Sequence, residues 1–183
     1  MKTIINSVTV SLPDSLKFYT ALGFEYKKTD GGAYVYDSSI IIHVSANTSH
    51  RLGLSLLQES REAELQKLSP YTKPARLRDG YLISDTSGGH IKLLQSFDLL
   101  PQSSSDAMLG SFAGISIEVI EIDRSKLIWG ALGYQQTAGD IEQGWMVLSK
   151  EANLSISLIK AGACPHIFTN PGLNYFNGEK IRR

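Results

Sequence analysis

Apolar and polar residues alternate over residues 3–12, and many of the apolar ones are β-branched, which is the pattern of a β-strand. Pro13 and Asp14 end this strand and begin a helix, with Asp14 as the predicted N-cap. Gly23 closes the helix. Three segments of strand character follow, at residues 24–30, 33–37 and 39–45. The start of the chain therefore predicts the order β-α-β-β-β.

The same order of patterns returns in the next stretch of sequence. A strand pattern is followed by a helix with charges on one face, then by a strand or hairpin, a Thr-Ser-Gly-Gly turn and a last strand. These segments occupy residues 51–57, 58–69, 75–85, 86–89 and 90–97. Residues 1–99 are therefore predicted to contain two βαβββ modules.

A third copy begins after a serine-rich segment at residues 100–110, which we interpret as a linker. Its strand, helix and two further strands are expected at residues 112–123, 124–134, 144–149 and 154–160. Ala-Leu-Gly-Phe at 21–24 returns as Ala-Leu-Gly-Tyr at 131–134. Such repeats indicate units that cannot close a core alone. Residues 111–183 are predicted to hold this third module and the start of a fourth, in an α+β fold.

Composition narrows the class of protein. Lys and Arg number 18, as do Asp and Glu, so nothing indicates binding to nucleic acid or to an anionic membrane surface. No apolar run approaches the roughly 20 residues of a membrane span, and the N-terminus lacks the apolar core of a signal peptide. A single cysteine, Cys164, fits a reducing compartment. We expect a cytoplasmic protein.

Residues 8–24 and 87–95 resemble the vicinal oxygen chelate (VOC) superfamily, which includes glyoxalase I, bleomycin-resistance proteins, extradiol dioxygenases and methylmalonyl-CoA epimerase. Its modules commonly open with a strand, Pro-Asp, a helix ending in Phe-Tyr and a Leu-Gly-Phe turn. Pairs of modules commonly close with an Asp-Pro-Asp-Gly turn, which residues 85–89 match without the proline. The resemblance implies glyoxalase-like βαβββ modules forming a curved, cup-shaped mixed sheet with helices outside.

Metal-dependent members of this superfamily draw ligands from the first and last strands of their modules. The resemblance carries those positions onto Ser7 and Ser116 in first strands and onto His43, Lys92 and Ser157 in last strands. One imidazole, hydroxyls and an ammonium do not make a divalent-metal site, and a lysine charge beside a cation is unfavourable. We therefore expect no metal cofactor, with His43 as the one candidate ligand and a divalent metal as the alternative.

The other histidines and the cysteine are interpreted as loop, turn or idle residues, namely His50, His90, His166 and Cys164. Aromatic residues recur on the predicted strands, as Tyr34, Tyr36, Tyr81 and Trp145. Aromatic side chains on the inner face of a cup would line a pocket with polar tips. The alternative is that they fill the core. With the carried-over positions, these aromatic residues form the candidate ligand-binding set.

Three functions remain open from the sequence. The first is the binding of a small organic molecule in the cup, in the manner of bleomycin-resistance proteins, because the metal positions are degenerate. The second is a divalent-metal-dependent lyase, isomerase or dioxygenase that uses an unusual ligand set including His43. The third is a non-catalytic module that works through protein contacts.

The third module raises a question of assembly, because modules of this kind close a cup in pairs. Its apolar face would be a large exposed patch on a lone monomer; the residues concerned are Ile115, Ile117, Val119, Val147, Leu154, Ile156 and Leu158. We therefore expect a homodimer in which third modules complete each other, or a chain that is part of a longer protein. The alternative is that the third module packs onto the first pair.

Overall fold

A computed structural model describes residues 2–47, 50–51, 53–58, 62–95, 100–150, 154–163 and 172–176. The first module contains β1 (Lys2–Val8), α1 (Leu12–Ala21), β2 (Glu25–Thr29), β3 (Gly32–Tyr36) and β4 (Ile41–Ser45). The second contains β5 (Gly53–Gln58), α2 (Glu62–Leu68), β6 (Ala75–Arg76), β7 (Gly80–Ser84) and β8 (His90–Gln95). The third contains β9 (Ser111–Val119), α3 (Ile122–Ala131), β10 (Gln135–Asp140), β11 (Trp145–Ser149) and β12 (Ser155–Lys160), and β13 (Gly172–Phe176) follows.

Helix α1 begins at a different residue from the one that the sequence pattern predicts. Its N-cap is Ser11, whose side chain accepts a hydrogen bond from the backbone N–H of Asp14. Pro13 lies in the first turn, where its missing N–H costs nothing. Asp14 is not the cap, because its carboxylate instead accepts a hydrogen bond of 2.6 Å from the Ser11 hydroxyl. Gly23, at φ 90°, follows the end of the helix.

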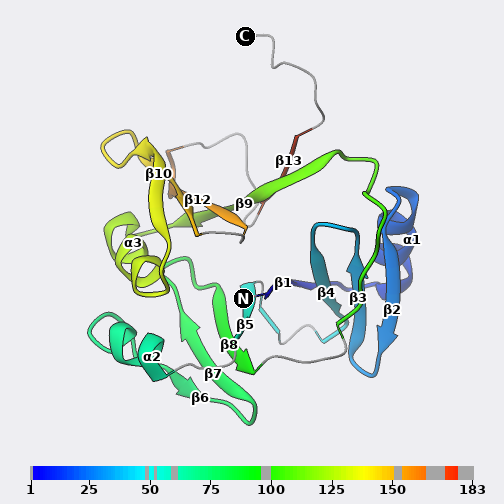
Figure 1. Cartoon of the computed structure of the whole chain (residues 1–183), viewed down its shortest axis with the longest axis horizontal. Helices are drawn as coiled ribbons and strands as arrows, with labels where there is room; N and C mark the ends of the chain where they lie inside the picture. Colours follow the sequence, from blue (N-terminus) through cyan, green and yellow to red (C-terminus); the bar gives the residue numbers. More distant parts are fainter. Residues whose placement is uncertain are drawn as a thin grey trace.

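The first two modules share one eight-stranded sheet, in the order β2-β3-β4-β1-β5-β8-β7-β6. Strands β1 and β5 pair antiparallel at its centre, and within each module the first and last strands pair in parallel. Figure 1 shows this first sheet curving from β2 to β6, with α1 and α2 on its convex side. Leu16 of α1 and Leu68 of α2 join the core formed by that side of the sheet. The predicted α+β glyoxalase-like architecture is confirmed.

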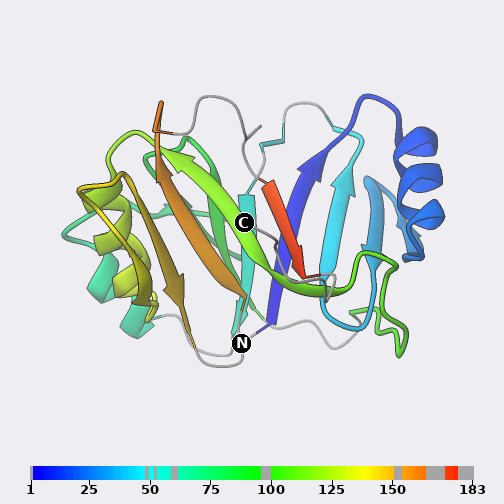
Figure 2. The same ribbon diagram turned by 90° about the horizontal axis from the view of Figure 1, so that it is seen from above.

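The third module forms a second sheet, in the order β10-β11-β12-β9-β13. It lies across the convex side of the first sheet, with α3 beside α2 (Figures 1 and 2). Strand β13 pairs antiparallel with β9, as β5 pairs with β1. Strand β10 is a polar, largely exposed segment that the sequence pattern did not predict. Its pairing with β11 holds it in the sheet.

The apolar face of the third module lies inside the chain rather than on its surface. Val119, Ile156 and Leu158 have no measurable exposure, and Ile115 is 1% exposed. These side chains share one core with Leu54 of the first sheet. The expectation of a large exposed patch on a monomer was therefore wrong, because the third module packs onto the first pair. This packing removes the reason to expect a homodimer.

A buried carboxylate joins the second module to the third. Asp85, in the turn between β7 and β8, accepts hydrogen bonds from the Ser125 hydroxyl at 2.6 Å and from Trp129 Nε1 at 3.1 Å. Its own neighbour Thr86 contacts Ser125 at 2.6 Å. Because both partners lie on α3, the turn fixes where that helix sits on the first sheet.

The serine-rich segment at residues 100–110 runs along the first module. The backbone N–H of Met108 donates to the Leu22 carbonyl at 2.8 Å, and that of Ser38 donates to the Ser105 carbonyl at 2.9 Å. Ser103 donates its hydroxyl hydrogen to Glu25 at 2.6 Å. These bonds attach the segment to the first module along its length. None of the helices in the described part of the chain has the length and apolarity to cross a membrane.

Candidate functional site

Two rows of side chains cross the concave face of the first sheet, the face turned away from the helices. Strand register aligns the rows across β3, β4, β1, β5 and β8. The first row is Tyr34, His43, Asn6, Gly53 and His90, and the second is Tyr36, Ile41, Ile4, Ser55 and Lys92. The two rows give this face a group of polar side chains near the seam between the two modules.

Asn6 and Ser55 connect the two modules at the centre of this face. The Asn6 amide donates to the Ser55 hydroxyl at 2.9 Å, and the hydroxyl approaches the amide oxygen at 3.3 Å. Both residues are buried, at 9% and 3% exposure. Buried polar groups are costly unless paired, so this mutual pairing allows them to sit at the seam.

His43 lies between Asn6 and Tyr34 and is half-buried. Its ring packs 5.1 Å from that of Tyr34, measured between centroids. Burial lowers the pKa of His43, and the charges of Lys92 and His50 lower it further. His43 is therefore neutral at neutral pH, with one ring nitrogen to donate and one to accept. Burial raises the pKa of Tyr34, so its phenol remains a donor.

One end of the concave face, across β1, β5 and β8, is apolar. Ile4, Leu57 and Leu94 form a small buried cluster there. Tyr34, Ile41, Leu77 and Leu100 pack against this cluster. A molecule bound on this face would therefore meet hydrocarbon at one end and an imidazole, a phenol and the Lys92 ammonium at the other. That combination suits a small organic molecule with an anionic or strongly accepting group.

The structure divides the candidate ligand-binding set among three places. Tyr34, Tyr36, His43 and Lys92 share the concave face of the first sheet. Ser116, Ser157 and Trp145 lie together on one face of the second sheet, where Ser116 pairs with Ser157. Ser7 and Tyr81 lie on the helix-covered side of the first sheet.

Ser7 was expected beside His43, but the structure places Asn6 there. Ser7 pairs with Val44, one residue beyond His43, and side chains alternate between faces along a strand. Asp14 is the third residue of α1, whereas Asp123 is the second residue of α3. Counting back seven residues from each aspartate therefore gives strand residues on different faces. Counting back from the two Ala-Leu-Gly turns instead aligns Asn6 with Ser116.

Tyr81 was also expected to face the cup. It pairs with Leu93, which is fully buried, and its ring packs against the core beneath the helices. The alternative interpretation of the aromatic residues, that they fill the core, therefore describes Tyr81. Periodicity along a single short strand does not say which of its two faces meets the helices.

Among the described residues, the concave face does not bring together the donors of a divalent-metal site. No three His, Cys, Asp or Glu side chains converge anywhere among the described residues. His43 is accompanied by Lys92, and at the corresponding place on β5 stands Gly53, where a Cβ would overlap the His90 carbonyl oxygen. The nearby His50 contacts the Ser45 hydroxyl through Nδ1 at 2.8 Å. Cys164 and His166 lie outside the described residues.

No protein-family model matches the chain, and no curated protein matches it in sequence. Solved structures do match its fold. The manganese-bound glyoxalase from Novosphingobium aromaticivorans has a TM-score of 0.56 at 15% identity, over 94% of this chain and 62% of that one. Homoprotocatechuate 2,3-dioxygenase from Arthrobacter globiformis has a TM-score of 0.63 at 11% identity, over 86% of this chain and 58% of that one.

A xylose isomerase-like TIM barrel/4-hydroxyphenylpyruvate dioxygenase fusion protein matches 93% of this chain with a TM-score of 0.63 at 12% identity. This chain spans 34% of the length of that protein. Across the three neighbours, it therefore covers from about one third to just under two thirds of their lengths. At such identities the likeness establishes the fold that glyoxalases and extradiol dioxygenases share, and no particular activity.

Proposed function

We propose that the protein binds a small organic molecule on the concave face of the first sheet and that it does so without a resident divalent metal. The observation that carries this proposal is the presence of Lys92 on the same face as His43, where its charge helps to lower the pKa of the imidazole. A cation held near His43 would be repelled by the lysine ammonium. An organic anion would instead be attracted to the ammonium and could accept a hydrogen bond from the neutral imidazole.

The ligand class follows from the other side chains on the same face. Tyr34 and His43 offer ring surface for stacking, and the cluster around Ile4 offers an apolar contact. A small aromatic molecule with a carboxylate or phenolate group fits this combination. Asn6 and Ser55 already satisfy one another, so we assign them to positioning the seam rather than to the first contact with ligand.

A metal-dependent lyase, isomerase or dioxygenase is the second candidate, because the fold is that of a manganese-bound glyoxalase and of a ring-cleaving dioxygenase. His43 is the residue that such an enzyme would use. The described residues do not supply the further imidazoles or carboxylates that a divalent ion requires. The donor set therefore favours binding without metal.

Calorimetry with 2-naphthoate and S-benzylglutathione as probes tests the proposal. We expect a saturable heat with at least one probe, and about ten-fold weaker binding in Lys92→Met because a charge-assisted contact is lost. Lys28→Met is the matched control, since Lys28 is exposed on β2 and pairs with Ala33 of the helix-covered side. Unchanged affinity in both Lys92→Met and His43→Gln, or no binding of either probe, would refute the proposal.

A further inference from the structure

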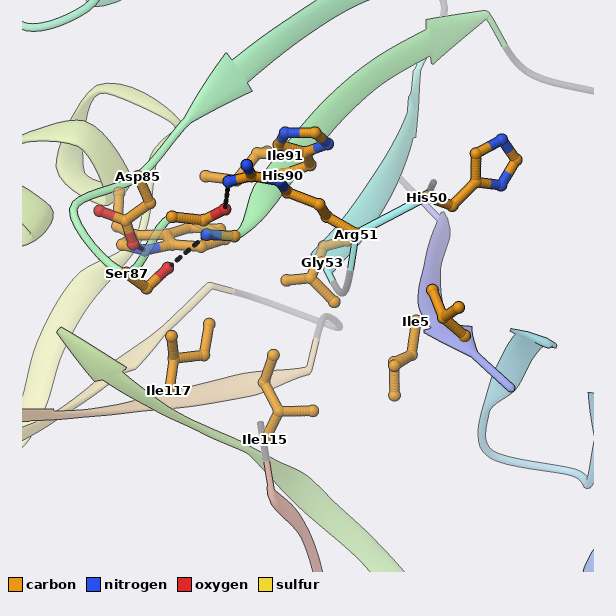
Figure 3. Close-up of a pocket in the computed structure, with 15 residues that line it drawn as sticks. Ile5, His50, Arg51, Gly53, Asp85, Ser87, His90, Ile91, Ile115 and Ile117 are labelled. Carbon is orange, nitrogen blue, oxygen red and sulfur yellow. Dashed lines mark hydrogen bonds between the residues drawn. The ribbon is translucent and has the colours of Figure 1, made fainter. Parts of the chain in front are cut away.

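A cavity lies on the opposite side of the first sheet from His43, between that sheet and the third module. It has a volume of about 360 Å³. Figure 3 shows Ile115 and Ile117 rising from β9 toward strands of the first sheet, with Ile5, Gly53 and Ser87 around the space. The volume falls within the range of small-molecule sites.

The deep walls of this cavity are hydrocarbon. Ile5, Leu54 and Ile91 come from the convex side of the first sheet, and Ile115 and Ile117 come from β9. The fully buried indole of Trp129 completes the wall, and its N–H already donates to Asp85. Because the indole N–H already has its hydrogen-bond partner, an apolar ligand could pack against Trp129 without leaving a buried donor unsatisfied.

The rim of the cavity is polar and carries a guanidinium. Arg51 donates from Nη1 to the Gly88 carbonyl oxygen at a long 3.4 Å, and it has no carboxylate partner within 4.0 Å among the described residues. His50 and His90 also line the cavity near this rim. The register of β8 turns the His90 side chain toward the concave face, so only its backbone side borders the cavity. Burial, followed by the charges of Arg51 and Lys92, lowers the pKa of His90, so its imidazole is neutral at neutral pH.

Asp85 is the one acidic side chain among the described residues that line the cavity, and it is already occupied. Its oxygens accept from Ser125, from Trp129 and from the Thr86 backbone N–H. Three donors hold this carboxylate toward α3 and the turn. Arg51 therefore has guanidinium N–H groups available for a ligand at the rim. The Asp85 carboxylate, at the deep end of the cavity, is already hydrogen-bonded to protein donors.

We propose that this cavity is a ligand site for a monocarboxylic acid with an apolar body, whose carboxylate binds Arg51 at the rim and whose hydrocarbon part lies between Ile91 and Ile117. The site is built from residues of all three modules, so its ligand would bridge the first sheet and the third module. It lies on the other side of the sheet from His43 and Lys92, and it is independent of the function proposed for the concave face.

Decanoate and decanol are the probes that test this inference, with Trp129 as the reporter. The chain contains two tryptophans, and Trp145→Phe removes the other, which is 40% exposed on the second sheet. In that background we expect a saturable change of Trp129 fluorescence on adding decanoate. Arg51→Gln should weaken decanoate about ten-fold and leave decanol binding unchanged, because only the acid uses the guanidinium.

Matched variants separate the cavity from other places. Ile117→Phe places a larger side chain in the cavity and should abolish the response to both probes, with circular dichroism verifying the fold. Arg78→Gln, an exposed arginine outside the cavity, should change nothing. Should Ile117→Phe fail to fold, the decanoate-specific effect of Arg51→Gln carries the test alone.

Two results would overturn the inference. One is the absence of a saturable response to decanoate in the Trp145→Phe protein. The other is decanoate binding that Lys92→Met removes while Arg51→Gln and Ile117→Phe preserve it, since the acid would then lie on the concave face. A loss of naphthoate binding in Lys92→Met with decanoate binding intact would show that the two sites are separate, and failure of either proposal would leave the other standing.

Discussion

Trp129 donates its indole N–H to Asp85 at 3.1 Å, across the boundary between the third module and the second. Both groups are buried, with Trp129 at 0% and Asp85 at 7% exposure. Ser125, one turn earlier on α3, donates to the other carboxylate oxygen. A single acidic residue in the turn that closes the first module pair thus positions the helix of the third module and one wall of the cavity beneath it.

Replacing this carboxylate should destabilise the protein strongly. In Asp85→Ala, the Trp129 N–H and the Ser125 hydroxyl stay buried but each loses the carboxylate oxygen that accepts its hydrogen bond. We therefore expect the free energy of unfolding to fall by about 2–4 kcal/mol. Asp85→Asn keeps one acceptor, so its loss should be smaller. Urea denaturation measures the change. The control Asp79→Asn, at an exposed aspartate in the turn between β6 and β7, should lie within about 0.5 kcal/mol of the parent. A loss in Asp85→Ala no larger than in this control would contradict the assignment.

The pKa of His43 should lie below the usual 6.5, and removing its cationic neighbour should raise it. Lys92→Met deletes a positive charge that disfavours the protonated imidazole, so the pKa of His43 should move up toward 6.5. Histidine-resolved NMR titration measures both values. Titration of His43 above 6.5 in the parent, or an unchanged value in Lys92→Met, would count against this arrangement of charges.

The lowered pKa of His43 should also make the protein less stable as the pH falls. Since the pKa of His43 is lower in the folded than in the unfolded chain, the unfolded chain takes up the proton first as pH falls. The contribution of His43 to the free energy of unfolding is therefore complete above pH 6.5. It is lost as the pH falls toward the pKa that His43 has in the folded chain. His90 contributes with the same sign. The slope of unfolding free energy against pH between about pH 7 and 5 should be smaller in His43→Gln.

Metal removal should leave the protein unchanged. Elemental analysis of the purified chain should find divalent metal well below one equivalent, and EDTA should not shift the melting temperature, because the described residues bring no three ligands together. Near one equivalent of manganese, iron, zinc or nickel, lost together with stability in His43→Ala, would instead favour the metal-dependent enzyme.

Two glycines should respond in opposite directions to alanine. Gly130 is exposed on α3, and a Cβ at this position would have no other atom within 4 Å, so Gly130→Ala should raise the free energy of unfolding by about 0.5–1 kcal/mol. Gly53 allows β5 to approach the His90 carbonyl, and Gly53→Ala should cost more than about 2 kcal/mol. Denaturation of the two variants under one set of conditions gives the comparison; a loss of stability in Gly130→Ala would contradict the first expectation.

The repeated βαβββ order was readable from the sequence because it depends on local periodicity. Alternation over β1 and helical spacing before the Ala-Leu-Gly turns are visible within a few residues of chain. Strand β10 was missed for the converse reason. Its residues are polar and mostly exposed, and only hydrogen bonding to β11 makes the segment a strand.

Among the residues of the concave face, some were likewise identified from the sequence and one was missed. His43 and Lys92 were picked out as candidate ligand-binding positions, and their ligand role remains a prediction. Asn6 was missed because the face that a strand residue takes depends on register. The aspartate from which the position was counted stands one residue later in α1 than in α3, and a shift of one residue exchanges the two faces.

The sequence by itself determined the modules, their order and the turns between them, because propensity and periodicity act over short stretches of chain. Only the tertiary structure decided where the third module lies, and so the existence of the cavity beneath β9. That placement depends on the burial of Ile115 in the core that Leu54 also joins, and on the hydrogen bond from Trp129 to Asp85, all of which involve residues far apart in the chain. Contacts of this kind leave no periodic pattern, because each is satisfied by a partner that the local sequence does not contain.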